Sequence, residues 1–149
     1  MQSFSNPLQF ENVLIDAAEK TVGKNAVTSR NKRIGGAASV WELDYVFEPE
    51  WSGGKIYIFE FKYTSSPTLP DSTVLTQFAR FESLRDANAE RGIGFLLVTN
   101  GIVRRNFERP DSFFVLDDVK TVEAWRTKVL AWARKEVPQW TLQSGYSGG

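Results

Sequence analysis

Two neighbouring segments of the chain alternate apolar and polar residues with a period of two. Residues 40–47 read VWELDYVF, and residues 55–63 read KIYIFEFKY. This period is that of a β-strand, whose successive side chains point to opposite faces of a sheet. Residues 49–54, PEWSGG, are turn-forming and separate the two segments. We therefore predict an antiparallel hairpin over residues 40–63.

Three other segments carry apolar residues at intervals of three and four, which is the period of an α-helix. The predicted helices cover residues 8–22, 71–90 and 121–135. Asn6-Pro7 supplies a capping residue, followed by a proline suited to the first helical position. Asp71 or Ser72 is expected to cap the second helix.

Three short apolar segments are predicted to be further strands. They cover residues 26–29, 94–99 and 112–116. The run GFLLVT over residues 94–99 is continuously apolar, as expected for a strand covered on both faces. Together these segments predict one α/β domain over residues 1–140, in which helices flank a mixed sheet on both faces. Residues 141–149 are expected to form a flexible tail.

Composition removes several kinds of chemistry. The 149 residues include no cysteine and no histidine. Disulfides, cysteine or histidine metal sites, iron–sulfur clusters and histidine-based triads are therefore excluded. There is no apolar run long enough to span a membrane and no signal-peptide pattern, so a cytoplasmic protein without membrane contact is expected. Catalysis would have to use carboxylates, lysine, arginine or hydroxyl groups.

The charges balance overall but are unevenly distributed. Lys and Arg number 18, and so do Asp and Glu. Residues 20–40 hold basic residues and no acidic one, whereas acidic residues gather over residues 42–60. Arg30, Lys32 and Arg33, in a predicted loop, could contact nucleic-acid phosphates, or they could be a solvated loop.

The hairpin carries a candidate chemical site. Glu60 and Lys62 are two residues apart on a strongly apolar strand, so they share a face. Asp44 lies on the preceding strand, where the hairpin can bring it beside Glu60. Burying such charges is costly unless they are compensated, and a divalent cation would do so. Alternatively, Asp44 is an ordinary exposed residue, and Glu60 with Lys62 is a solvated pattern on an edge strand.

Asp44, fifteen intervening residues and then Glu60-Phe61-Lys62 resemble the motif of the PD-(D/E)xK, or restriction-endonuclease-like, nucleases. The resemblance extends over residues 8–117, because a helix precedes the hairpin and the order strand, strand, helix, strand follows. It implies a restriction-endonuclease-like fold. Leu43 stands where the motif has its proline.

The resemblance implies roles for particular residues. Asp44, Glu60 and the backbone carbonyl of Phe61 would bind Mg²⁺ or Mn²⁺, with Glu11 or Glu19 as a third acidic ligand. Lys62 would be the catalytic base or would stabilise charge on the phosphate. Gln77 resembles the Gln of a catalytic Q-x-x-x-Y element, in which Phe81 takes the place of the tyrosine. The list of candidate catalytic residues is Asp44, Glu60, Lys62 and Gln77.

The expected function is a metal-dependent nuclease that hydrolyses phosphodiester bonds of DNA. In length and layout the chain is similar to archaeal Holliday-junction resolvases, which act as dimers, so a homodimer or another protein partner is a further expectation. One alternative is a catalytically inactive module of the same fold that binds nucleic acid or serves in an assembly. Another is a protein-interaction domain in which the hairpin residues have no catalytic role.

Overall fold

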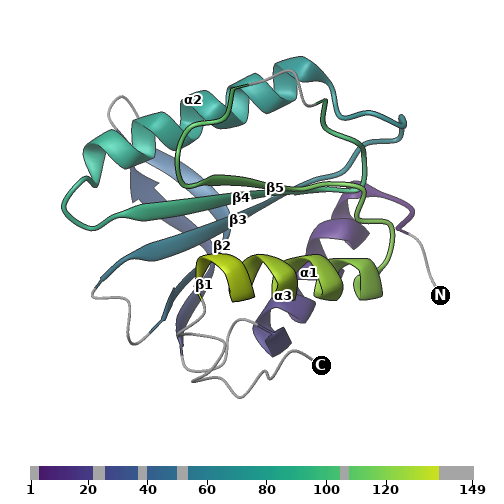
Figure 1. Ribbon diagram of the computed structural model, residues 1–149, viewed down its shortest axis with the longest axis horizontal. Helices are drawn as coiled ribbons and strands as arrows, with labels where there is room; N and C mark the ends of the chain where they lie inside the picture. The colour runs from purple at the N-terminus through teal and green to yellow at the C-terminus, as the bar shows by residue number, and fades with distance from the viewer. Residues whose placement is uncertain (1–3, 22–25, 37–39, 50–53, 105–107, 138–149) are drawn as a thin grey trace.

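The computed structural model describes residues 4–21, 26–36, 40–49, 54–104 and 108–137. The elements follow one another in the order predicted from the sequence, with one strand ahead of the hairpin (Figure 1). They are α1 (Pro7–Thr21), β1 (Ala26–Gly35), β2 (Val40–Pro49), β3 (Ile56–Lys62), α2 (Asp71–Ala87), β4 (Ile93–Thr99), β5 (Phe113–Leu116) and α3 (Val122–Glu136).

The five strands form one mixed sheet in the order β1-β2-β3-β4-β5. The pairs β1–β2 and β2–β3 are antiparallel, whereas the pairs β3–β4 and β4–β5 are parallel. Helix α2 covers one face of the sheet, and α1 and α3 cover the other (Figure 1). The predicted α/β class, with helices on both faces of a mixed sheet, is confirmed. No helix in the described part of the chain is long and apolar enough to cross a membrane.

The hydrophobic core lies in two layers, one on each face of the sheet. Strand β3 contributes to both layers in alternation: Phe59 and Phe61 pack with α1 and α3, and Ile56 and Ile58 pack with α2. The ring of Trp125 in α3 meets Phe59 edge-on, with 5.2 Å between the ring centroids. Because both faces of β3 are covered, a charged side chain on this strand needs a partner that compensates its charge.

Strand β1 is longer than predicted. The expected strand covered residues 26–29 and was followed by a loop, whereas β1 continues to Gly35 and pairs with β2 down to Val40. The prediction was wrong because the residues after Ser29 are mostly polar. An edge strand tolerates polar side chains, since main-chain hydrogen bonds to its one neighbour hold it in the sheet.

The two caps have different outcomes. At α1 the cap is confirmed, since the Gln9 N–H donates to Asn6 Oδ1 over 2.8 Å. At α2 the prediction was wrong, because the capping position is Pro70 and no side chain caps the helix. Asp71 lies in the first turn instead, where its negative charge interacts favourably with the helix dipole. The predicted flexible tail and most of the predicted hairpin turn lie outside the described residues.

Candidate active site

The candidate site lies where β2 and β3 separate. Their paired residues end at Tyr45 and Phe59, so Asp44 and Glu60 are the next residues to face each other. Side chains bridge the strands here: the Asp44 N–H donates to Glu60 Oε1, and the Phe61 N–H donates to Asp44 Oδ2, each over 2.9 Å. Carboxylates therefore serve as acceptors where main-chain carbonyls would continue the ladder.

Strand β2 is irregular at Asp44. Leu43 and Val46 both belong to the core on the α2 side, although residues three apart in a regular strand point to opposite faces. Tyr45 lies in the core on the other side, so the alternation shifts by one residue around Asp44. Opposite Asp44 in the β1 register, Asn31 has a φ of 51°. Such a local irregularity re-aims a side chain, here the Asp44 carboxylate, toward β3.

Glu60 is a buried carboxylate with a counter-ion. Its side chain is 1% exposed, and its Oε2 accepts a hydrogen bond from Arg80 Nη1 at 2.9 Å. Burial raises the pKa of Glu60 to about 7, with the negative charge of Asp44 adding to the rise. The positive charge of Arg80 and the hydrogen bond from the Asp44 main chain act in the opposite direction. Near neutral pH this carboxyl is therefore close to its point of half-protonation.

Arg80, in α2, is held from several sides and was missed in the sequence analysis. Besides Glu60, its guanidinium donates to the Glu42 carbonyl and lies over the Trp41 ring, 5.1 Å from the centroid. Its side chain is 12% exposed. The one available signal was its position three residues after Gln77, on the flank of the same helix. A pattern of apolar residues does not show which strand residue such an arginine meets.

Glu11, in α1, is the acidic helix residue that reaches the site. Its carboxyl lies close enough to that of Asp44 for the two groups to interact. Burial first, and then the charge of Asp44, raise the pKa of Glu11. Burial likewise raises the pKa of Asp44, while the hydrogen bond from the Phe61 N–H and the charge of Lys62 oppose the rise. Two interacting carboxyl groups therefore meet where the pairing of β2 and β3 ends.

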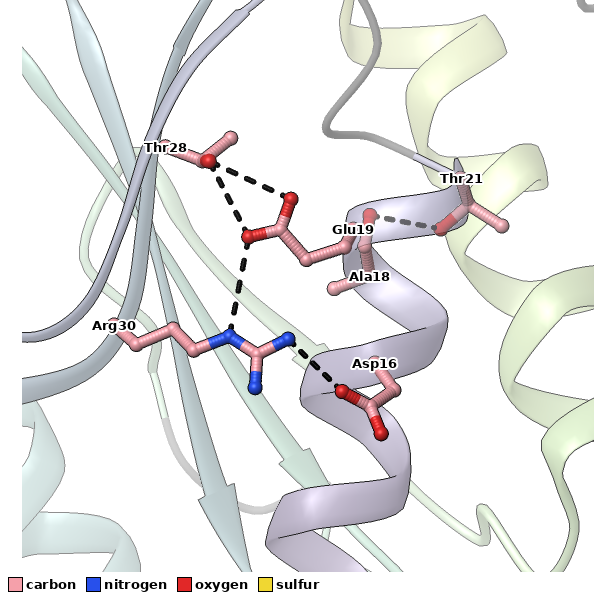
Figure 2. Close-up of polar contacts among 6 residues, drawn as sticks. All are labelled: Asp16, Ala18, Glu19, Thr21, Thr28 and Arg30. Carbon is pink, nitrogen blue, oxygen red and sulfur yellow. Dashed lines mark hydrogen bonds and ion pairs between the residues drawn. The ribbon is translucent and has the colours of Figure 1, made fainter.

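Glu19, the alternative to Glu11, lies elsewhere. It accepts a hydrogen bond from Thr28 Oγ1 over 3.3 Å and approaches Arg30 Nε at 4.0 Å (Figure 2). Arg30 also pairs with Asp16, with 2.9 Å between Nη2 and Oδ1. Figure 2 shows these side chains connecting α1 to β1. Arg30 thus has acidic partners within the protein, which compete with any phosphate.

Lys32 and Arg33, predicted with Arg30 to contact nucleic acid, are also on β1 and not in a loop. Arg33 is exposed and Lys32 is half-buried. Both lie on the edge strand of the sheet.

Lys62 lies near the carboxylates at the end of β3, whereas Gln77 is buried on α2. The charge of Lys62 lowers the pKa of Asp44 and of Glu60. Gln77 is 3% exposed, and its Oε1 has no hydrogen-bond partner in the described part of the chain. A buried acceptor without a partner is uncommon, and it keeps Gln77 a candidate for contact with a ligand or a water molecule. Phe81, one turn further along α2, is fully buried in the core.

The oxygen atoms at this site meet some of the requirements for binding a hard divalent cation such as Mg²⁺. Glu11 and Asp44 bring two carboxyl groups close together, and carboxylate oxygens are ligands that such a cation prefers. The Phe61 N–H points toward β2, and in a strand the carbonyl of the same residue points the same way. However, no group of three or more acidic side chains among the described residues is arranged to hold an ion. Both oxygens of Glu60 are bound, one to the Asp44 main chain and one to Arg80.

Comparison with known proteins identifies the fold and no family. No family model and no curated protein matches the chain. Among solved structures, it is similar to AF1548, a protein of unknown function, with a TM-score of 0.54 and 15% identity. It is also similar to a chain in a half-complex from a tetradecameric assembly of Thermococcus gammatolerans McrB AAA+ hexamers with bound McrC, with a TM-score of 0.54 and 14% identity.

These matches cover most of this chain but less of the others. They include 76% of this chain and 61% of AF1548, and 85% of this chain and 33% of the chain in the McrB assembly. The protein therefore spans under two thirds of the length of either structure. At this level of identity, the likeness shows a shared arrangement of strands and helices and nothing about activity.

Proposed function

We propose that the protein is a divalent-metal-dependent nuclease that hydrolyses phosphodiester bonds of DNA. The observation that carries the proposal is that Glu11 of α1, Asp44 of β2 and Lys62 of β3 come together where the pairing of β2 and β3 ends. Carboxylates held together beside a lysine suit the hydrolysis of a phosphate ester, in which negative charge develops on the phosphate.

Each residue of the site would have a separate role in this reaction. Glu11, Asp44 and the Phe61 carbonyl would hold Mg²⁺ or Mn²⁺, which supplies positive charge for the phosphate and lowers the pKa of a bound water. The hydrogen bond from the Phe61 N–H fixes the orientation of the Asp44 carboxylate. Lys62 places an ammonium group beside these oxygens, where it can stabilise the negative charge that develops on the phosphate.

Glu60 and Arg80 form the support of the site in this proposal. The Arg80 guanidinium and the Asp44 N–H hold the two carboxylate oxygens of Glu60. Glu60 thereby fixes the main chain of Asp44 from the opposite strand. If Glu60 is also a metal ligand, as the motif resemblance implies, it has to exchange its hydrogen bond to Arg80 for the ion.

Binding of DNA would depend on local charge. The net charge of the chain is zero, so a strong general attraction to nucleic acid is not expected. Lys62, Lys32 and Arg33 are cations on the strands that could contact a phosphate, whereas Arg30 is paired with Asp16. Such a small set favours help from a second copy of the chain or from a protein partner.

A second candidate function is a catalytically inactive module that binds nucleic acid or serves in an assembly. Two observations favour it. Both carboxylate oxygens of Glu60 are hydrogen-bonded within the protein, and no group of three acidic side chains in the described ranges is arranged to bind a metal ion. The two functions differ in whether binding of a divalent ion depends on Asp44.

The test is cleavage of linear, circular, single-stranded and branched DNA with Mg²⁺, Mn²⁺ or a chelator. We expect metal-dependent cleavage by the wild-type protein, and loss of cleavage in Asp44→Asn and in Lys62→Met. Glu82→Gln, an exposed substitution on α2, is the matched control and should cleave normally. Circular dichroism would show that each variant is folded.

Two outcomes would contradict the proposal. Normal cleavage by Asp44→Asn or Lys62→Met would mean that the site lies elsewhere. If no substrate is cut and calorimetry detects no Mn²⁺ binding that depends on Asp44, the inactive module becomes the better description.

A further inference from the structure

A pocket of about 650 Å³ adjoins the candidate site at the end of β3. It is formed by residues from the start of α1, the end of β3, the following loop and the first turn of α2. The lining residues are Pro7, Lys62, Tyr63, Thr64, Ser65, Leu69, Pro70 and Thr73. Lys62 belongs both to this pocket and to the group around Asp44, so the pocket and the candidate site share one cation.

The loop that bounds the pocket is held in place by hydrogen bonds to its main chain. The Asn100 side chain makes two hydrogen bonds with the main chain of Thr64. The Thr64 N–H donates to Asn100 Oδ1 over 2.8 Å, and Asn100 Nδ2 donates to the Thr64 carbonyl over 2.7 Å. Further along the loop, the Leu69 N–H donates to the Ile102 carbonyl at 3.0 Å. The pocket is therefore preformed, which lowers the entropy cost of binding a ligand.

The lining combines the groups that a nucleotide requires. Lys62 provides positive charge for a phosphate, and Ser65 and Thr73 provide hydroxyl groups for hydrogen bonds. Tyr63 adds an aromatic side chain, and its ring is steadied by Phe10, with 6.0 Å between the centroids. Bases stack on aromatic side chains, and this contact is available only when the face of the base is not covered by its neighbours in a duplex.

We propose that this pocket binds one unpaired nucleotide of a DNA strand, beside the phosphate that the Asp44 site would cleave. The inference rests on the proposed nuclease function and specifies its substrate as single-stranded or locally unpaired DNA. The pocket volume lies in the range of roughly 300–1,000 Å³ found for small-molecule sites. A single nucleotide fits within such a space.

The experiment compares pocket-filling variants with a matched control. Thr73→Tyr fills the pocket from α2, and Ser65→Trp fills it from the exposed loop. Thr76→Tyr is the control, because Thr76 is an exposed threonine on the same helix and does not line the pocket. The probe is a fluorescein-labelled thymidine oligonucleotide of about ten residues, tested single-stranded and paired with its complement, in the presence of a chelator.

Fluorescence anisotropy should show that the wild-type protein binds the single strand about tenfold more tightly than the duplex. Thr73→Tyr and Ser65→Trp should each lose about tenfold in affinity for the single strand, and Thr76→Tyr should bind like the wild type. Thermal unfolding of each variant shows whether it is folded, and either filled variant alone suffices for the comparison.

Retention of single-strand affinity by both filled variants, or a wild-type preference for duplex, would overturn the pocket assignment. Cleavage with Mn²⁺, measured in parallel, separates this result from failure of the nuclease proposal. Pocket-dependent binding without any cleavage would leave the pocket assigned and remove the nuclease. Asp44-dependent cleavage of single strands at the wild-type rate by both filled variants would leave the nuclease and remove the pocket.

Discussion

Glu60 should link the stability of the protein to pH, because its carboxyl is buried among other acidic groups. Its pKa rises from the ordinary value of 4.5 to about 7 in the folded protein. Below pH 4.5 the carboxyl is protonated in both the folded and the unfolded chain, so it costs no stability. Between pH 4.5 and 7 the folded protein keeps a proton that the unfolded chain releases, so stability falls as the pH rises.

The size of the effect follows from the same two values. Each pH unit in this interval costs ~1.36 kcal/mol, and the interval from 4.5 to about 7 therefore costs about 3 kcal/mol. Above pH 7 the loss is complete and stays constant. Burial also raises the pKa of Glu11 and of Asp44, so their contributions have the same sign. Those two groups remain in a Glu60 variant and largely cancel when it is compared with the wild type.

The perturbation is Glu60→Gln, which keeps the shape of the side chain and removes its titration. Urea denaturation followed by tryptophan fluorescence would give the free energy of unfolding from pH 4.5 to 8.5, at constant ionic strength and with a chelator. Relative to the wild type, the variant should gain about 3 kcal/mol between the two ends of this range. The comparison across pH cancels the constant cost of losing one hydrogen bond. Glu82→Gln, exposed on α2, controls for the removal of a glutamate.

A wild-type protein and a Glu60→Gln variant with parallel pH profiles would refute the reasoning. That result would mean that the Glu60 carboxyl ionises in the folded protein as readily as in the unfolded chain. A gain of stability in the variant toward low pH would refute the sign of the argument. The nuclease proposal does not depend on this outcome, because the experiment excludes metal.

Two further predictions concern the partners of Glu60 and Asp44. Arg80→Met should destabilise the protein at pH 8 by on the order of 3 kcal/mol and less at pH 5, where Glu60 is protonated. In the same denaturation assay, Arg85→Met, at a partly exposed arginine of α2, should change stability by about 0.5 kcal/mol. Equal losses would refute a special role for Arg80. Glu11→Gln should lower the initial rate of metal-dependent cleavage by about a hundredfold or more, whereas Glu19→Gln should leave this rate near the wild-type value. Similar cleavage rates in the two variants would show that Glu11 does not belong to the site.

The sequence was sufficient to predict the strands and helices that carry the site. The hairpin follows from a period of two in residues 40–47 and 55–63, and the structure pairs β2 with β3 as expected. The face shared by Glu60 and Lys62 also follows from local geometry, because side chains alternate along any strand. Asp44 beside Glu60 follows from the hairpin once the strands are in register. These features depend on residues that are close in the sequence or joined by a short connection.

Only the tertiary structure decided which distant residues complete the site. Glu11 and Glu19 are both acidic residues on α1, and the packing of this helix on the sheet brings the first to Asp44 and the second to Thr28. The contact between Arg80 and Glu60 depends on how α2 lies across β3. Helix periodicity shows which side is apolar, but the rotation and shift of a packed helix result from the fit of all its side chains against the sheet.

Strand β1, at the edge of the sheet, likewise combines a feature that the sequence predicted with features that only the tertiary structure decided. The sequence predicted a strand over residues 26–29, while pairing with β2 extends β1 to Gly35 and places Arg30 against α1 (Figure 2). Main-chain hydrogen bonds to a neighbouring strand do not depend on side-chain polarity, so no pattern in residues 30–35 predicts them. What the sequence determined is thus the local periodicity and the chemistry of the hairpin, and the tertiary structure alone decided the partners of its charges, because they come together through packing.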